Sequence, residues 1–375
     1  MKITKFFALL CAAAVGFVAC EPVGNTEEPN VTGKITLSAS KTTIELGETV
    51  TFKAEMKDAE TGEMIDVTEF VSIYDSELNK ISNPWTPTAS GNYTFNATYG
   101  AESSNNITIS VMAQMPEVPA DPDPENLAFN HRVVVIDHTG VGCPNCPLMT
   151  DNLRAIAATD WHKHYNEVTC HAGGYAGNDP ASSQAATALN QTQSPNGYPT
   201  LNINFNTATV GNYQTSYFVN VMSQTLEQCV KKSGADVGIA MAVEGDNTNV
   251  YCAAQIKAKT AKEYKAVAWL LESGIYSPNQ AGATKDYHKI YNYALRNISG
   301  QYSKGNVAGE SVGVIEKGQT LDCAFQLPIT STKWNPENMG VLVIVSTKTN
   351  SGSWEIANTA YCSLDDKAKA YEYVE

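Results

Sequence analysis

The sequence predicts a multidomain protein of α/β plus all-β class, in which a central α/β domain lies between two β-sandwich domains. The first observation is the length of 375 residues, which exceeds the size of one ordinary domain. The second is an alternation of apolar and polar residues in both the early and the late part of the chain, typical of half-buried strands. The third is a middle segment, residues 128–235, where β-branched runs alternate with helical spacing, typical of an α/β unit.

Residues 1–19 predict a lipoprotein signal peptide. Two lysines precede an apolar run that is too short for a comfortable membrane span. The run ends on a small residue directly before Cys20 and resembles a bacterial lipobox, in which that cysteine becomes the lipidated first residue of the mature chain. The alternative is a simple secretory signal with an incidental cysteine. Residues 20–33, rich in Pro, Gly, Glu and Asn, predict a flexible tether.

Residues 34–112 predict a small β-sandwich. Apolar residues alternate on one face in several stretches, and glycines stand between the stretches. The alternating residues are Val50, Phe52 and Ala54, then Tyr93, Phe95, Ala97 and Tyr99, and then Ile107, Ile109 and Val111. The segments GETVTF and GNYTFNATYG resemble bacterial immunoglobulin-like domains, and this resemblance implies an immunoglobulin-like fold without identifiable chemistry.

The α/β domain, residues 128–235, is expected to follow a linker. Residues 113–127 contain four prolines, a density that favours an extended, semi-rigid spacer. The elements expected after the linker are a strand at 132–137, a helix at 144–158, a strand at 167–171, a helix begun by Asp179 and Pro180 and ending near residue 193, a strand at 201–205 and a helix at 213–232.

Residues 236–366 predict a C-terminal β-sandwich domain. Apolar residues alternate over 237–243 and again over 250–256, and further apolar stretches suggest more strands. One short helix, with the sequence DYHKIYNYALRNI at 286–298, is expected to interrupt them.

The strongest candidate site is Cys143-Pro144-Asn145-Cys146. It follows a buried strand and opens a predicted helix, so Cys143 is expected at the helix N-terminus, where free backbone N–H groups favour a thiolate. The two-residue spacing brings the second sulfur within reach of the first, so that it can resolve a mixed disulfide. A zinc site is the main alternative, but the sequence has no second CxxC, and His162 and His164 are poorly spaced for it.

A strand, a CxxC, a helix and a later Tyr-Pro-Thr follow one another, and with this order residues 128–235 resemble the thioredoxin fold. The resemblance implies that Asp137 is a buried acid that handles the proton of the second cysteine, and that Pro199 is a cis proline against the disulfide. Gly142 departs from the aromatic residue usual before the first cysteine, and this leaves the direction of electron flow open.

Several segments after the proline linker are similar to a family of bacterial outer-membrane lipoproteins named after a twenty-eight-kilodalton outer membrane protein. These segments are DHTGVGCPNCP, HAGGYAGNDP, GYPTLNINF, LLESGI and DYHKIYNYALRNISG, in the expected order. The resemblance implies a lipoprotein of the bacterial cell envelope, in the outer membrane, facing either the periplasm or the outside. Adhesion has been proposed for the family, so a surface binding role is a second hypothesis.

Other histidines and cysteines are weaker candidates. His171 ends the second predicted strand and either tunes Cys143 or bonds to loop backbone, and His138 is a less favoured candidate. Five further cysteines follow the CxxC, and their pairing is left open between buried free thiols and structural disulfides: Cys170, Cys229, Cys252, Cys323 and Cys362.

The net charge of −14 and the absence of any basic run argue strongly against nucleic acid as a partner. The leading hypothesis is therefore thiol–disulfide exchange, with Cys143 attacking and Cys146 resolving. It needs no cofactor or metal, only a partner protein with thiols or disulfides, and the membrane is reached through the lipid on Cys20. The rival is a binding or adhesion lipoprotein in which the CPNC disulfide is structural or vestigial. The redox hypothesis requires that the two sulfurs be accessible and that Pro199 lie near them.

Overall fold

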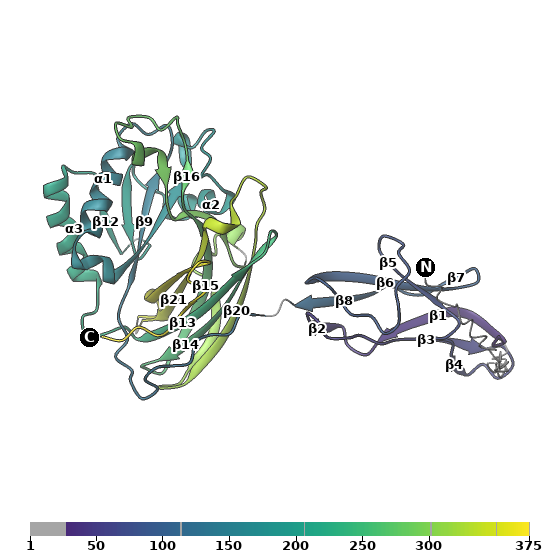
Figure 1. Ribbon diagram of the computed structural model, residues 1–375. Coiled ribbons are helices and arrows are strands. Elements are labelled where there is room, and N and C mark those ends of the chain that lie inside the picture. The colour runs from purple at the N-terminus through teal and green to yellow at the C-terminus, as the bar shows by residue number, and fades with distance from the viewer. Residues whose placement is uncertain (1–27, 113–114, 206, 301, 350, 375) are drawn as a thin grey trace, which may run out of the picture. The chain divides into compact units, whose positions relative to one another are not determined.

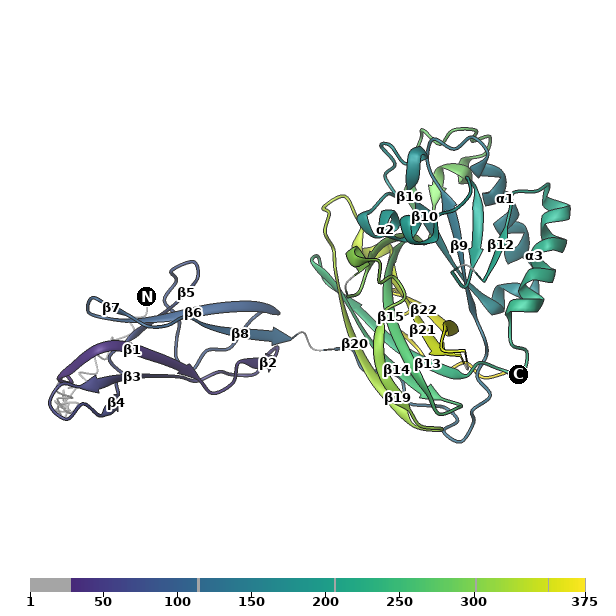
Figure 2. The same cartoon turned by 180° about the vertical axis from the view of Figure 1, so that it is seen from behind.

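The computed structural model describes residues 28–112, 115–205, 207–300, 302–349 and 351–374. The signal peptide and the lipidated Cys20 expected from the sequence lie outside the described residues. The chain divides into two compact units, Met1–Gln114 and Met115–Glu375 (Figures 1 and 2). Strands dominate both units, since the described structure is 42% strand and 16% helix, with three α-helices.

The first unit consists of two small β-sheets around a shared core. One sheet has the order β1-β3-β4, and the other has the order β2-β8-β6-β5, with β7 paired to β6. Phe52 and Phe95 come from different sheets, and their rings meet edge to face at 5.0 Å in this core. The resemblance to immunoglobulin-like domains is not confirmed by these features. The strands are β1 (Val31–Ala39), β2 (Thr43–Glu45), β3 (Phe52–Asp58), β4 (Met64–Asp66), β5 (Ser72–Asp75), β6 (Gly91–Tyr99), β7 (Glu102–Ser103) and β8 (Ile107–Met112).

The second unit is built on one nine-stranded mixed sheet. Its order is β12-β11-β9-β10-β18-β15-β21-β22, and β19 pairs with β15. Strands β9 and β10 are parallel, whereas β11 runs antiparallel to β9. The strands are β9 (Val133–Thr139), β10 (Tyr165–His171), β11 (Thr200–Ile203), β12 (Ala208–Val210), β15 (Lys262–Glu272), β18 (Ala294–Ile298), β19 (Glu310–Ile315), β21 (Met339–Lys348) and β22 (Trp354–Ser363).

Helices cover both faces of the β9–β12 end of this sheet. Helices α1 (Cys146–Ala157) and α3 (Thr215–Cys229) pack their apolar stripes on one face, where Met149 and Phe218 meet Val135 of β9. Helix α2 (Gln184–Gln193) packs on the opposite face. Successive residues of β9 therefore face α1 and α2 in turn, and Asp137 lies on the α1 face, as Val135 does.

A four-stranded antiparallel sheet of order β20-β14-β13-β23 shares a second apolar core with β15, β21 and β22. Met241 and Cys252 from the smaller sheet belong to the same core as Leu270 and Val343 from the larger one. The strands are β13 (Val237–Gly245), β14 (Asn249–Ala258), β20 (Thr320–Pro328) and β23 (Ala368–Lys369), and a separate hairpin pairs β16 (Ile275–Tyr276) with β17 (Ile290–Tyr291).

The fold class expected from the sequence is wrong. Residues 128–235 do not form a thioredoxin-like α/β domain set apart from a C-terminal sandwich, because their sheet continues into the strands that follow. Thr169 of β10 pairs in parallel with Ala294 of β18, and β18 pairs in turn with β15. The hydrogen bonds between these strands join the two segments into one mostly β unit.

Two local expectations also fail. Residues 286–298 were expected to be a short helix, but they form a single 3₁₀ turn at Asp286–Lys289, then β17 and β18. All five residues of β18 are buried, because this strand fills the place between β10 and β15. Helix α2 begins not at Asp179 but after Ser183, whose side chain accepts a hydrogen bond from the Ala186 backbone N–H.

Among the described helices, none combines the length and the apolar character that a membrane crossing requires.

Candidate functional site

Cys143 and Cys146 form a disulfide at the start of α1, with their Cα atoms 5.5 Å apart. Cys143 lies in the loop that leaves β9, and Cys146 is the first residue of the helix, after the N-cap residue Asn145. The sequence predicted that Cys143 would occupy the helix N-terminus. The helix begins later than expected, so Cys146 is the cysteine in the first helical turn, where free backbone N–H groups favour a thiolate.

Both sulfur-bearing residues are buried. Cys143 is 1% exposed and Cys146 is 3% exposed, so the accessibility that the redox hypothesis requires is not met at Cys143 in this arrangement. The cover is a segment of residues 277–292, which we call the strap. Gln280 of the strap donates a hydrogen bond to the Cys143 carbonyl at 3.1 Å, and the Ala281 N–H donates to the Val141 carbonyl at 2.8 Å.

Gly282 brings the strap backbone against the CxxC loop. It has a φ of +71°, and a Cβ at this position would collide with the Pro144 carbonyl. The strap therefore sits on the CxxC loop in backbone contact, which only glycine permits at this point.

Asp151 of α1 fastens the other half of the strap. Its carboxylate accepts hydrogen bonds from the Tyr287 hydroxyl at 2.6 Å and from Lys285 Nζ at 2.9 Å, and it lies 3.0 Å from Nε2 of His288. Burial alone would raise the pKa of Asp151, but the bonds from Tyr287, His288 and Lys285 outweigh it and lower this pKa to about 2. Asp151 is thus the ionised anchor of the strap.

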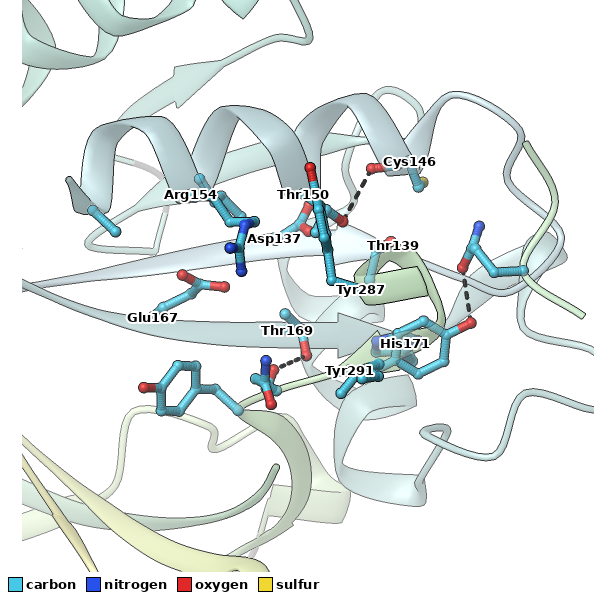
Figure 3. Close-up of a pocket in the computed structure, with 16 residues that line it drawn as sticks. Asp137, Thr139, Cys146, Thr150, Arg154, Glu167, Thr169, His171, Tyr287 and Tyr291 are labelled. Carbon is cyan, nitrogen blue, oxygen red and sulfur yellow. Dashed lines mark hydrogen bonds between the residues drawn. The ribbon is translucent and has the colours of Figure 1, made fainter. Parts of the chain in front are cut away.

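A cavity of about 310 Å³ lies between α1, strands β9 and β10, and the strap (Figure 3). Cys146 contributes to its wall, whereas Cys143 does not. The cavity floor carries two carboxylates, Asp137 from β9 and Glu167 from β10. The disulfide is therefore packed on the Cys143 side and borders a polar cavity on the Cys146 side.

Neither of the two acids forms an ion pair with a described residue. Asp137 is 4% exposed, and its Oδ1 has no hydrogen-bond partner among the described residues. Burial raises the pKa of Asp137 well above its ordinary value, and the neighbouring Glu167 raises it further. Burial also raises the pKa of Glu167 to about 7. Asp137, predicted as the acid of the site, thus shares a cavity with Cys146 and with a second acid.

Arg154 lies at the rim of this cavity, about two turns along α1 from Cys146 (Figure 3). Its guanidinium stacks over the Tyr287 ring at 4.3 Å, and its side chain is exposed to solvent. The entrance is therefore cationic, whereas the floor is acidic.

His171, the predicted tuning residue, lines the cavity but is engaged elsewhere. Its Nδ1 lies 2.8 Å from Oδ2 of Asp179, and the same oxygen accepts a bond from the Val141 N–H at 2.7 Å. Burial would raise the pKa of Asp179, but its bonds, led by the one from His171, lower it. The pair holds the loop that precedes Cys143, so His171 positions this loop.

Pro199 follows a cis peptide bond, as the resemblance implied. Thr200 pairs with His138, which places Pro199 beside the last residue of β9, next to the loop that carries Cys143. Pro199 is buried and does not line the cavity. His138 points to the opposite face of the sheet, where its ring nitrogens contact Asn190 and Gln193.

The other cysteines of the described chain are free. Cys170, Cys252 and Cys362 are buried, and Cys229 and Cys323 are partly buried. Burial raises the pKa of the Cys323 thiol to about 11 and that of Cys362 likewise, so these thiols are poor nucleophiles. No group of three or more His, Cys, Asp or Glu side chains in the described residues is arranged to hold a metal ion.

The sequence interpretation missed Glu167, Arg154 and the strap. Glu167 had a readable signal, because Glu167, Thr169 and His171 alternate along β10 and therefore share one face. No sequence signal indicated the position of the strap, because its contact with the CxxC loop joins residues more than a hundred positions apart.

Residues 186–361 match the family model described as outer membrane protein Omp28. This match covers less than half of the chain, and it supports the relation expected from the sequence. It also confirms the expected location in the outer membrane of the bacterial cell envelope. A search of curated proteins gives no match.

Solved structures similar to this chain include HBP35 of Porphyromonas gingivalis, with 18% identity, a TM-score of 0.50 and coverage of 66% of this chain and 78% of that one. A protein from Agrobacterium tumefaciens has 17% identity, a TM-score of 0.39 and coverage of 63% and 95%. A domain of the outer membrane lipoprotein Omp28 from Porphyromonas gingivalis has 15% identity, a TM-score of 0.23 and coverage of 35% and 88%. At these identities, the likeness to HBP35 concerns the fold alone.

Proposed function

We propose that this protein carries out thiol–disulfide exchange in the cell envelope through Cys143 and Cys146. The observation that carries the proposal is the position of Cys146 in the wall of a polar cavity that also holds the buried acid Asp137. A disulfide that serves only as a staple needs neither a cavity beside one sulfur nor an unpartnered carboxylic acid beneath it.

In the reaction, a thiolate attacks one sulfur of the disulfide and forms a mixed disulfide, while the other sulfur leaves as a thiolate. A second thiolate then resolves the mixed disulfide, so that two thiols are oxidised and the protein disulfide is reduced. Asp137 serves as the group that exchanges a proton with Cys146, because it shares the cavity with Cys146 and burial raises its pKa well above the ordinary value. Run in reverse, the same steps have Cys143 attack and Cys146 resolve.

A protein substrate reaches Cys143 only when the strap moves away. The strap is held to the CxxC loop and α1 by hydrogen bonds of Gln280, Ala281 and the Asp151 cluster, and its Tyr291 packs in an apolar cluster with Ala294. Opening of the strap therefore requires local breaking of these contacts. The partner is a protein thiol or disulfide in the envelope, and the lipid on Cys20 keeps the protein at the membrane.

The test is exchange on a model protein disulfide, measured for the wild-type chain, Cys143→Ser and Cys146→Ser, with Cys229→Ser as the matched control. Exchange should be lost in the Cys143→Ser and Cys146→Ser variants and be retained in the control. Equal exchange in all four proteins, with the fold intact by circular dichroism, contradicts the proposal.

A second candidate is a binding or adhesion protein with a structural disulfide. The burial of both cysteines favours it, because an enclosed disulfide is protected from exchange. In that case the Cys143→Ser variant would bind its target unchanged after refolding, and its only defect would be a lower free energy of unfolding.

A further inference from the structure

The floor of the cavity carries two acidic side chains. Asp137 and Glu167 lie on neighbouring strands and face the same space, and neither has an ion pair with a described residue. Burying carboxylates that lack hydrogen-bond donors is costly, and the cost is removed when a cationic group enters and donates to them. The arrangement is therefore that of an incomplete binding site.

The cavity has the size and chemistry of a small-molecule site. Its volume of about 310 Å³ lies at the lower end of the range typical for such sites, about 300–1,000 Å³. Three threonines, Thr139, Thr150 and Thr169, contribute to its lining. Cys146 lies at one end of α1, and Arg154 lies at the other end near the entrance (Figure 3). A ligand that fills the cavity lies against both the two acids of the floor and Cys146.

We propose that the cavity binds a small amino thiol, whose ammonium group contacts Asp137 and Glu167 while its sulfur reaches Cys146. The inference rests on the proposed exchange function and names its low-molecular-weight substrate class. Free cysteine, cysteamine and small peptides with an N-terminal cysteine belong to this class. When such a ligand also carries a carboxylate, Arg154 at the rim is placed to receive it.

The step balances without a further reactant. The amino-thiol thiolate attacks Cys146 Sγ, the Cys143–Cys146 bond breaks, and Cys143 leaves as a thiolate that takes up a proton. A second amino thiol attacks the mixed disulfide, forming the symmetrical amino disulfide and the Cys146 thiol. Two amino thiols are oxidised and one protein disulfide is reduced. Because the attack is on Cys146 through the cavity, the strap stays in place.

The test compares two thiols of nearly equal size, cysteamine with its ammonium group and 2-mercaptoethanol with a hydroxyl. The oxidised full chain is treated with each at equal thiolate concentration, near pH 8, where the Glu167 carboxylate is mostly ionised. Reduction of the disulfide is monitored by alkylating the freed cysteine thiols and measuring the mass of the protein. We expect cysteamine to react at least about tenfold faster, the effect of one charge-assisted contact. In Glu167→Gln this ratio should fall toward one, while the exposed control Glu244→Gln keeps the wild-type ratio.

A second measurement locates the bond. In Cys143→Ser, cystamine should form its mixed disulfide on Cys146 faster than the neutral bis(2-hydroxyethyl) disulfide does. Equal rates for charged and neutral reagents, or a preference that survives in Glu167→Gln, overturn the amino-thiol inference and leave the exchange function standing. A chain whose disulfide reacts with neither small thiol overturns the inference as well. Failure of the proposed function is marked separately, by equal protein exchange in the wild-type chain and the cysteine variants of the earlier test.

Discussion

At the scale of single residues, the site is defined by two acids placed under a disulfide. Asp137 could be predicted, because it precedes the CxxC at the end of a buried strand and the resemblance assigned it a role. Glu167 was missed although it lies on the same face as His171. Its unusual environment arises from β10 lying between β9 and β18, and that pairing is not encoded locally.

The protonation of Glu167 should make stability depend on pH. The ordinary pKa of a glutamate side chain is 4.5, and burial raises the pKa of Glu167 in the folded protein to about 7. The folded state therefore binds more protons between these values, so stability should fall as pH rises from 4.5 to about 7 and stay lower above it.

Glu167→Gln removes this titration. Relative to wild type, the variant should gain on the order of 1–2 kcal/mol of unfolding free energy between about pH 4.5 and pH 8. Urea denaturation at both pH values measures the gain, and the exposed Glu244→Gln is the control. A difference between variant and wild type that does not change with pH would show that Glu167 titrates normally.

His171 illustrates a placement that the sequence could indicate only in part. The strand end was predicted, and the structure puts the ring at the edge of the cavity. Its partner Asp179 was assigned to a helix cap, whereas it bonds to His171 and to the Val141 N–H. The same short side chain can satisfy either role, and only the tertiary arrangement selects between them.

At the scale of elements, the strap and α1 decide whether Cys143 is reached. Asp151 fastens three strap side chains, so its replacement should favour the open strap. We expect Asp151→Asn to speed reduction of the disulfide by a bulky dithiol or a protein reductant about tenfold, because one charge-assisted contact is worth about 1.5–3 kcal/mol. Reduction kinetics measure this, with the exposed Asp160→Asn as the matched control.

The Gly282→Ala variant should also favour the open strap, because the added Cβ would collide with the Pro144 carbonyl. In both Asp151→Asn and Gly282→Ala, cysteamine should still reduce the disulfide faster than 2-mercaptoethanol does, as in the wild-type protein. Unchanged reduction by the bulky reagent in Asp151→Asn and in Gly282→Ala would mean that the strap does not control access.

The elements themselves were predictable where their pattern is local. The buried strand before the CxxC, the helix after it and the helix at Thr215–Cys229 follow from continuous apolar runs and from helical spacing. Residues 286–298 were expected to be helical but form a turn and two strands, because the neighbours β10 and β15 complete the hydrogen bonding of β18.

At the scale of the whole molecule, one sheet crosses the border that the sequence suggested between an α/β and an all-β domain. Composition and periodicity change near residue 236, and these local signals cannot show which strands pair across the change. The cavity depends on this pairing, because its floor comes from β9 and β10 while its cover comes from the strap and the adjoining Tyr293.

The continuous sheet predicts how fragments behave. A chain of residues 115–375 should unfold cooperatively, whereas residues 128–235 alone should lack stable tertiary structure, because β10 would lose its partner β18 and expose apolar surface. Near-ultraviolet circular dichroism and denaturant titration distinguish the two. A 128–235 fragment that folds cooperatively by itself would contradict the single-sheet description.

The most direct measurement for the central claim is the reduction potential of the Cys143–Cys146 disulfide in the full chain, obtained by equilibration with dithiothreitol at graded ratios. The double variant Cys143→Ser/Cys146→Ser supplies the baseline for the free thiols. An exchange-active disulfide should titrate between about −270 and −120 mV. A potential below about −300 mV would identify a structural staple and contradict the exchange function.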